Sequence, residues 1–549
     1  MRTSIVGAMF AGMALIMASS AAYPCTSLLV TKGASADGSV MITYTCDGEF
    51  HPHLEYLPAA DYQPGDTLAI EDWRTGIKGY IKQVAHTYAV VGMMNEHQLA
   101  IGETTFDGRE ELYNEKGLLE YWDLISLALQ RARTAREAIT VMTDLVAEYG
   151  YGSTGESISL ADTKEAWILE IIGKGPERQG AVWVAVKVPD GYISAHANKA
   201  RIGEFPLNDP ENCLYSGDVI SFAAGKGYYD PESRAPFRFC DVYCPATPKN
   251  KRSCEARVWS IFRRAAPSQK FSPDYHRGVE GASPYPLWTK PDTKLALEDV
   301  FALMRDHYEG TPYDLTQGID AGPYGTPNRW RPLTWVIGGD STVIYSWERP
   351  ISTMQTAFSF VSQSRGWLPD PIGGVYWYGL DDTYMTCYTP LYCGIDAVPH
   401  SFTVGSMQKF SWESAWWVFN FVSNLANLKY SYMAPEIMAV RQEIEGIYLA
   451  VQPAIEKTAL DLYSADPELM TRFLTDYSVR HGEMVVDRWR QLGEHLLTKY
   501  NDGYVQDENS RPNDKGYSDG WLREVVKSRP DQFRLPKQKE AGPESRLID

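Results

Sequence analysis

The chain has 549 residues, and its 70 acidic side chains outnumber the 52 basic ones, giving a formal net charge of −18. A hydrophobic fraction of 44% is typical of a soluble globular protein with a substantial buried core. Long runs of lysine and arginine are missing from the sequence. Because clustered cations dominate nucleic-acid affinity, we expect no nucleic-acid partner.

The N-terminus predicts the compartment. A short basic start, Met1–Ser4, precedes an apolar run, Ile5–Ala18, and a stretch of small residues, Ser19–Ala22. This order is typical of a secretory signal peptide over residues 1–22, so the mature protein is expected to be periplasmic or extracellular. The apolar run is shorter than the roughly 20 residues that cross a bilayer, and no later stretch reaches that length, so no membrane span is expected.

Two residues separate the expected signal-peptidase site from the first cysteine. Ser20-Ala21-Ala22 has the small-x-small pattern of a cleavage site, which leaves Tyr23 and Pro24 as a short propeptide before Cys25. Lipidation of Cys25 competes with this interpretation. It is less favoured, because a lipidation site has a small residue directly before the cysteine.

In chain order, the first part of the sequence predicts hairpin strands followed by two helices. The strands are Thr26–Thr31, Ser39–Tyr44, Tyr88–Met93 and Leu99–Thr104, separated by Gly, Asp and Asn turns. Apolar residues at helical spacing then predict a helix over Tyr121–Ala132. Thr134 is a candidate N-cap for a second helix that continues to Val146.

Strand character returns further along the chain. Three strands are expected, at Glu165–Ile172, Ala181–Val188 and Tyr192–His196, and the apolar run in the first of these indicates a buried sheet. From about Trp412 to Tyr500, periodic Leu, Ile and Met with few Pro and Gly predict several packed helices. Residues 501–549 are expected to form a polar, extended tail. No internal repeat and no long linker is evident.

The eight cysteines are too few for a disulfide-dense scaffold. Cys240, Cys244 and Cys254 cluster around a loop with Cys213 upstream, and Cys387 lies close to Cys393. In an exported protein this spacing favours disulfides over zinc, with unpaired buried thiols as the intermediate possibility. Seven cysteines remain when Cys25 is set aside, so at least one more is expected to be free or to pair between chains.

Most catalytic motifs are missing from the sequence. It contains no HExxH, GxSxG or GxxxxGK[ST] motif and no GxGxxG that opens a helix, which argues against zinc proteases, standard serine hydrolases and nucleotide enzymes. His51 and His53 alternate around a proline, but no third metal ligand is evident, so a rim loop is the better interpretation. We therefore expect neither a metal nor a cofactor.

Cys25 remains as the candidate nucleophile, because it follows the expected cleavage site and opens the first strand. Removal of Tyr23 and Pro24 places a thiol and a free α-amine on one residue. An α-amine with a pKa of about 7.7 to 8.0 can take the thiol proton near neutral pH, so no separate histidine base is needed. The alternative is an ordinary buried thiol at the start of a strand.

Several dispersed segments carry a family resemblance, in the same order along the chain. They are Cys25–Ser27, Lys32–Ser35, Asp37–Ser39, Gly92–Glu96, Ala100–Thr104, Tyr149–Glu156, Asp162–Trp167, His196–Ile202 and Arg349–Trp377. Together they resemble the dipeptidase family of cysteine N-terminal-nucleophile hydrolases. The resemblance covers most of residues 25 to about 400, and more weakly the helices that follow. It implies a catalytic domain over residues 25–405 and a helical extension over 406–500.

One departure from the family concerns the second strand. Relatives commonly carry an Arg-Asn-x-Asp run there, whereas this chain reads Tyr44-Thr45-Cys46-Asp47. The aspartate is kept in register, but a tyrosine occupies the position of the arginine that normally stabilises the thiolate or holds the site together. That role must be filled differently in this chain.

The resemblance implies a role for each remaining candidate. Cys25 attacks a substrate amide to form a thioester while its α-amine shuttles the proton, and Asp47 orients the ammonium. Asn95 and Asn198 donate amide N–H groups to the oxyanion or hold the substrate backbone, with turn residues as the alternative. A dipeptide amine needs an acidic partner, for which Glu103 is a candidate beside Asp47, although an exposed strand position is slightly favoured for Glu103. Tyr44 completes the substrate-binding candidates.

The implied fold is α+β, a four-layer α/β/β/α sandwich with a C-terminal helical extension. The implied activity is hydrolysis of dipeptides or other short peptides. Two alternatives stay open, namely an acylase for penicillin-type or bile-salt-type amides and an exported peptide- or glycan-binding protein without catalysis. The sequence does not fix the oligomeric state.

Overall fold

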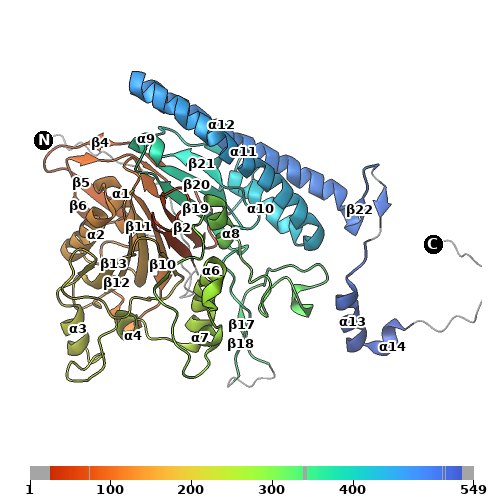
Figure 1. Cartoon of the computed structure of the whole chain (residues 1–549), viewed down its shortest axis with the longest axis horizontal. Coiled ribbons are helices and arrows are strands. Elements are labelled where there is room, and N and C mark those ends of the chain that lie inside the picture. The colour runs from red at the N-terminus through yellow and green to blue at the C-terminus, as the bar shows by residue number, and fades with distance from the viewer. Residues whose placement is uncertain (1–24, 73–74, 338–342, 510, 514, 535–549) are drawn as a thin grey trace, which may run out of the picture.

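A computed structural model describes residues 25–72, 75–337, 343–509, 511–513 and 515–534 (Figure 1). The expected signal peptide and the Tyr23–Pro24 dipeptide lie outside the described residues. Two antiparallel sheets form the centre of the protein, and the long helices near the C-terminus lie along one side of it (Figure 1). The chain is therefore a mixed α and β protein with a C-terminal helical region, as the sequence predicts.

The first sheet carries the strand that follows Cys25. Its strand order is β16 (Trp288–Thr289), β14 (Ile193–His196), β1 (Ser27–Val30), β2 (Val40–Asp47), β19 (Thr356–Ser364), β20 (Val375–Leu380) and β21 (Thr389–Tyr392). All of the paired strands run antiparallel. Because β1 and β2 lie in the middle of this sheet, their side chains are buried, and Cys25 enters the structure at the centre of the fold.

The second sheet is a meander. Its order is β15 (Cys213–Tyr215), β13 (Ala181–Lys187), β12 (Ala166–Gly173), β11 (Gly155–Ala161), β10 (Ala100–Phe106), β9 (Met94–Asn95), β8 (Val90–Val91) and β3 (Tyr56–Leu57). The strand expected over Tyr88–Met93 is replaced by the short strands β8 and β9, because the chain turns between them at Gly92, whose φ is +57°. Strand β11 was not expected from the sequence, since its Glu and Ser residues do not resemble a buried strand.

The two sheets pack face to face. β2 contacts β10 and β11, and β1 contacts the same two strands. Gly102 of β10 allows a close approach, because a Cβ atom there would lie 3.1 Å from the Cβ of Tyr44. One apolar core fills the space between the sheets and continues under the C-terminal helices, and a second core lies between the second sheet and two helices.

Those two helices are α1 (Tyr121–Arg131) and α2 (Ala135–Tyr149), which cover the outer side of the second sheet and confirm the predicted helix pair. Thr134 caps α2 by accepting a hydrogen bond from the Glu137 backbone, as expected. Smaller helices connect the later strands: α3 (Val219–Gly225), α4 (Phe239–Tyr243), α5 (Pro248–Asn250), α6 (Ala256–Ala265), α7 (Asp274–Arg277), α8 (Leu297–Met304) and α9 (Asp370–Gly373).

The predicted helical region is confirmed as α10 (Ala415–Ala426), α11 (Tyr430–Ala465) and α12 (Pro467–Lys499). α10 contacts β20, and both long helices contact β21, so this group covers the outer side of the first sheet (Figure 1). The tail expected to be extended contains two short helices, α13 (Asp519–Ser528) and α14 (Pro530–Phe533), so that expectation is wrong for residues 519–533. Ser518 caps α13 by accepting a hydrogen bond from the Trp521 backbone. A capping serine predicts a helix start, but it was overlooked in a segment interpreted from its polar composition alone.

Four two-stranded sheets complete the described part of the chain. Their strands are β4 (Ala60–Asp61) with β7 (His86–Thr87), β5 (Thr67–Asp72) with β6 (Gly76–Lys82), β17 (Thr334–Trp335) with β18 (Tyr345–Ser346), and β22 (Val505–Gln506) with β23 (Pro512–Asn513). No helix within the described ranges is both long and apolar enough to cross a membrane.

Candidate active site

Cys25 lies directly before β1 and is buried, with 4% of its surface exposed. The backbone carbonyl of the next residue, Thr26, accepts a hydrogen bond from the Thr45 amide of β2 at 2.9 Å. The Thr26 amide donates to the Thr45 hydroxyl at 3.0 Å. Side chains alternate along a strand, so Tyr44 and Cys46 share the other face of β2 from Thr45. Cys25 Sγ lies 3.7 Å from Tyr44 Oη and also contacts the Cys46 thiol.

The Cys25 thiol is held in its protonated form. Burial raises its pKa well above the ordinary value, and Cys46, Glu103 and Asp47 raise it further, because each places a hydrogen-bonding or acidic group near the sulfur. A thiolate at this position therefore needs a base close by.

Arg257, the second residue of α6, links the start of the first strand to the rest of the site by hydrogen bonds. Its Nη1 donates to the Cys25 carbonyl at 2.5 Å and to Thr26 Oγ1 at 2.9 Å. Its Nη2 donates to Asn198 Oδ1 at 2.9 Å. The guanidinium is fully buried, and its fork geometry lets one side chain join three segments of the chain.

Asp47 forms a buried ion pair at the end of β2. Arg349 Nη2 lies 2.5 Å from Asp47 Oδ2, and the Thr356 hydroxyl donates to Asp47 Oδ1 at 2.6 Å. Burial raises the pKa of Asp47, and the charges of Arg349 and Arg257 oppose that rise. Arg349 and Arg257 thus place positive charge beside Asp47. Asp47 also acts electrostatically on Cys25, and its role toward the Cys25 amine stays a prediction.

The two predicted asparagines have different surroundings. Asn198 has a left-handed backbone, with φ of +56°, and its Nδ2 donates to the Thr105 carbonyl at 2.7 Å, so it belongs to the Arg257 network. Asn95 does not join that network. Its Nδ2 donates to the carbonyls of Leu129 and Ala132, each at 2.8 Å.

The Asn95 carbonyl oxygen accepts from the backbone amides of His97 and Leu99, at 3.0 and 3.1 Å. Both N–H groups of the amide are thus bound to the end of α1, and the oxygen organises the turn before β10. These contacts favour the turn-residue alternative for Asn95, and a role as oxyanion donor stays a prediction.

Glu103 of β10 is buried rather than exposed, with 1% of its surface accessible. Tyr44 Oη donates to Glu103 Oε1, and the Thr105 hydroxyl reaches Glu103 Oε2 at 3.5 Å and Glu156 Oε1 at 2.9 Å. Glu103 and Glu156, on the paired strands β10 and β11, also hydrogen-bond to each other. Burial raises the pKa of both carboxyl groups.

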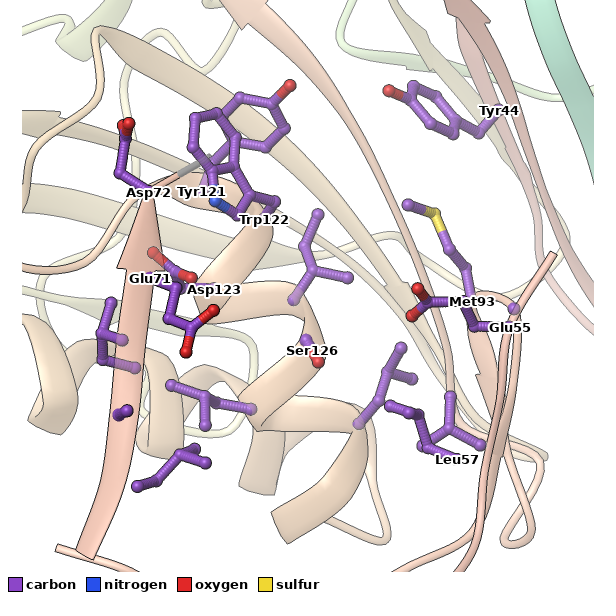
Figure 2. Close-up of a pocket in the computed structure, with 18 residues that line it drawn as sticks. Tyr44, Glu55, Leu57, Glu71, Asp72, Met93, Tyr121, Trp122, Asp123 and Ser126 are labelled. Carbon is purple, nitrogen blue, oxygen red and sulfur yellow. The ribbon is translucent and has the colours of Figure 1, made fainter. Parts of the chain in front are cut away.

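A cavity of about 200 Å³ opens beside this cluster. Figure 2 shows Tyr44 at one end of it, with Glu55 and Met93 on the same side and Tyr121, Glu71, Asp72 and Asp123 across the space. The walls come from β5, the β3–β8 region and α1. Tyr44 lines the cavity, as a substrate-binding candidate should, but Glu103 does not line it and lies behind Tyr44.

Four acidic side chains line the otherwise largely apolar cavity, namely Glu55, Glu71, Asp72 and Asp123. Burial raises the pKa of Asp123 to about 7 and also raises that of Glu55. The Tyr121 phenol belongs to both environments, because it lines the cavity and its pKa is raised by burial and by Glu103, Cys46 and Cys25. Sequence patterning placed Tyr121 only on the apolar side of a helix.

The remaining sequence candidates contribute no further site. All eight cysteines are buried and unpaired, so the expected disulfides are not formed and the structure fits the alternative of unpaired buried thiols. His51 bonds to Ser414 Oγ at 2.8 Å and His53 to the Gly405 carbonyl at 3.1 Å. Among the described residues, no group of three or more His, Cys, Asp and Glu side chains could hold a metal ion.

The buried Cys25 lies between two sheets, its carbonyl is held by Arg257, and its thiol faces Tyr44, which lines a cavity with acidic side chains. These features define a candidate thiol hydrolase. Comparison with protein families agrees with this class, because the model described as peptidase family C69 matches residues 53–443. The chain therefore belongs to peptidase family C69. The match begins downstream of Cys25.

Several curated relatives extend the similarity. The "Probable dipeptidase" of Salmonella dublin is 28% identical over 391 residues, which cover 68% of this chain and 81% of the relative. The protein of the same name from Latilactobacillus sakei is 26% identical and covers 72% and 79%. "Probable dipeptidase B" of Streptococcus pyogenes serotype M1 is 22% identical and covers 87% and 93%.

Proposed function

We propose that this peptidase hydrolyses dipeptides with Cys25 as an N-terminal nucleophile. The observation that carries the proposal is the position of Cys25. Its carbonyl is held by Arg257 and its thiol faces Tyr44, which is also one wall of the cavity. The names of the curated relatives support the same substrate class. The packing of two facing sheets between α1–α2 and α10–α12 supports the four-layer α/β/β/α sandwich of N-terminal-nucleophile hydrolases.

In the proposed mechanism, removal of the residues before Cys25 frees its α-amine. That amine takes the thiol proton, the thiolate attacks the substrate carbonyl carbon, and the amine returns the proton to the leaving nitrogen. Water then cleaves the thioester. Asp47 lies close enough to act electrostatically on Cys25 and would hold the ammonium form, while Asn198 positions Arg257.

The cavity supports a short substrate with a free amine. Its volume of about 200 Å³ is below the roughly 300 Å³ at which pockets for drug-sized ligands begin. Its carboxylates, including Glu55 and Asp123, favour the α-ammonium group of an unblocked peptide. Glu103, our sequence-based candidate for this contact, is replaced in this role by the cavity acids. Export also stays a proposal. It is based on the sequence pattern of residues 1–22, which lie outside the described residues.

The test is a panel of free dipeptides, N-acetylated dipeptides and acyl-amino acid conjugates, assayed under reducing conditions with protein whose mature N-terminus is determined by mass spectrometry. We expect turnover of free dipeptides by a chain that begins at Cys25, and none by Cys25→Ala. Cys213→Ala is the matched control, because Cys213 is equally buried but lies at the far edge of the second sheet.

Turnover by Cys25→Ala at the wild-type rate would refute the nucleophile. A preference for acetylated or conjugated substrates would identify an acylase instead. No turnover of any compound would restore the binding-protein alternative.

A further inference from the structure

Cys25 has no amine base before it is processed. In the full-length chain its nitrogen belongs to the peptide bond with Pro24, so it cannot take the thiol proton. The thiol is nevertheless buried, with its pKa raised well above the ordinary value. Under the proposed function, on which this inference rests, the cut before Cys25 therefore requires a different base.

A hydrogen-bonded chain of side chains leads away from the thiol. Cys25 Sγ donates to Tyr44 Oη, and the Tyr44 hydroxyl donates to Glu103 Oε1. Glu103 hydrogen-bonds to Glu156 on the neighbouring strand. All four residues are at most 4% exposed, so bulk water cannot substitute for any of these contacts.

The contacts assign the protons within the acid pair. Glu156 Oε1 accepts from Thr105, but Glu156 Oε2 is buried and has no donor among the described residues. Two adjacent buried carboxylates cannot both ionise, and one shared proton resolves the repulsion. Placing the shared proton on Glu156 lets this residue donate to Glu103. Glu103, which accepts from Tyr44, is then the ionised member.

We propose that Tyr44 and Glu103, with Glu156 as proton-holding partner, form the base that activates Cys25 for cleavage of its own Pro24–Cys25 bond. The thiol proton moves to Tyr44 Oη while the tyrosine proton moves to Glu103 Oε1. Charge is conserved, because a carboxylate becomes neutral as the thiol becomes a thiolate. The new Tyr44 hydroxyl proton then donates to the sulfur, as the family arginine would.

The remaining steps balance in the same way. The thiolate attacks the Pro24 carbonyl carbon, the carbon–nitrogen bond to Cys25 breaks, and the relay returns its proton to the departing nitrogen. Water hydrolyses the resulting thioester, which releases the Pro24 carboxylate and regenerates the thiol. From this point the freed α-amine serves as the base for peptide substrates. The tyrosine at the arginine position is therefore a maturation residue of this chain.

The experiment follows processing of the full-length chain in an exporting bacterial host by pulse–chase labelling, with the N-terminus of each form identified by mass spectrometry. Tyr44→Phe and Glu103→Gln are expected to accumulate the form that begins at Tyr23 and to slow conversion to the Cys25 form by about 100-fold or more, the usual size of a general-base contribution. The control is Tyr378→Phe, which removes another buried phenol of the first sheet, on β20, that bonds to neither the thiol nor Glu103. It is expected to process normally.

Two further readouts separate the relay from a structural role. The Gln side chain of Glu156→Gln can still accept from Thr105 and donate to Glu103. This variant is therefore expected to slow processing by less than about threefold, whereas Glu103→Gln is expected to slow it by about 100-fold or more. Residual processing of purified Glu103→Gln is expected to rise about tenfold per pH unit from pH 6 to 9, because only direct ionisation of the raised thiol remains. The titratable groups that interact with Glu103 are Cys25, Tyr44 of β2, Glu156 of β11, Tyr121 of α1 and Tyr151, while Cys46 and Asp47 act on Cys25.

Normal processing of Tyr44→Phe or Glu103→Gln would overturn the relay, and so would a residual rate that does not change with pH. These outcomes differ from failure of the proposed function. In that case wild-type protein would never reach the Cys25 form, or Cys25→Ala would be processed and active.

Discussion

Replacing Asn95 tests whether it stabilises the fold or assists catalysis. Asn95→Ala removes the two bonds to the carbonyls of Leu129 and Ala132 and the two from the amides of His97 and Leu99. Four buried hydrogen bonds at about 1 kcal/mol each predict a loss of about 4 kcal/mol in the free energy of unfolding. Because none of these contacts involves Cys25, we expect the catalytic efficiency per folded molecule to stay within about threefold, far from the roughly 100-fold loss of an oxyanion donor.

The assay combines urea unfolding, followed by tryptophan fluorescence, with steady-state hydrolysis of a free dipeptide. Asn95→Asp is the matched variant, because its oxygen still accepts from the two backbone amides while no group donates to the two carbonyls. It is expected to be at least half as destabilising as Asn95→Ala. Unchanged unfolding together with a catalytic efficiency reduced about 100-fold or more would refute this reasoning and return Asn95 to the catalytic site.

Two predictions concern buried charges. In a Cys25→Ala background, Asp47→Asn should lower the free energy of unfolding by about 3 to 5 kcal/mol, because Arg349 is left buried without its carboxylate partner. Adding Arg349→Met should recover part of that loss. Additive effects of the two substitutions in urea unfolding would argue against the ion pair. Burial lowers the pKa of His196 from 6.5 to about 3. Below pH 6.5 the unfolded chain therefore binds a proton that the folded chain does not, and the free energy of unfolding decreases as the pH falls. His196→Gln should reduce the wild-type loss between pH 7 and pH 5 by about 2 kcal/mol, and an unchanged loss would contradict the assignment.

Local patterns were sufficient to predict the elements that carry their own periodicity. The helix pair α1–α2, its Thr134 cap and the central strands β1 and β2 follow from spacing and capping residues alone. Strand β11 was missed because its polar residues, including Glu156, are buried against the other sheet rather than exposed.

The sequence nominated Cys25 by its position after the expected cleavage site and Asp47 by the family resemblance. In the structure Asp47 acts electrostatically on Cys25. Arg257 could not be found, because its partner Cys25 is 232 residues away in sequence and only the packing of α6 against the first sheet joins them. Helical spacing placed Tyr121 correctly on the buried side of α1, but it does not show that the Tyr121 phenol lies near Glu103 and lines the cavity.

The tether between Arg257 and the Cys25 carbonyl has a consequence for the mature chain. New chain ends usually fray, because the first residues have few contacts and regain conformational entropy when released. Here Thr26 is bonded to Thr45 through its amide and carbonyl, and Arg257 grips the carbonyl of Cys25. Cleavage of the Pro24–Cys25 bond would therefore release the Cys25 nitrogen, while Cys25 and Thr26 stay bound to Arg257 and Thr45. Under the proposed function, a terminus anchored in this way would present the Cys25 sulfur and amine in one fixed orientation, and each catalytic cycle would be spared the entropic cost of finding that orientation.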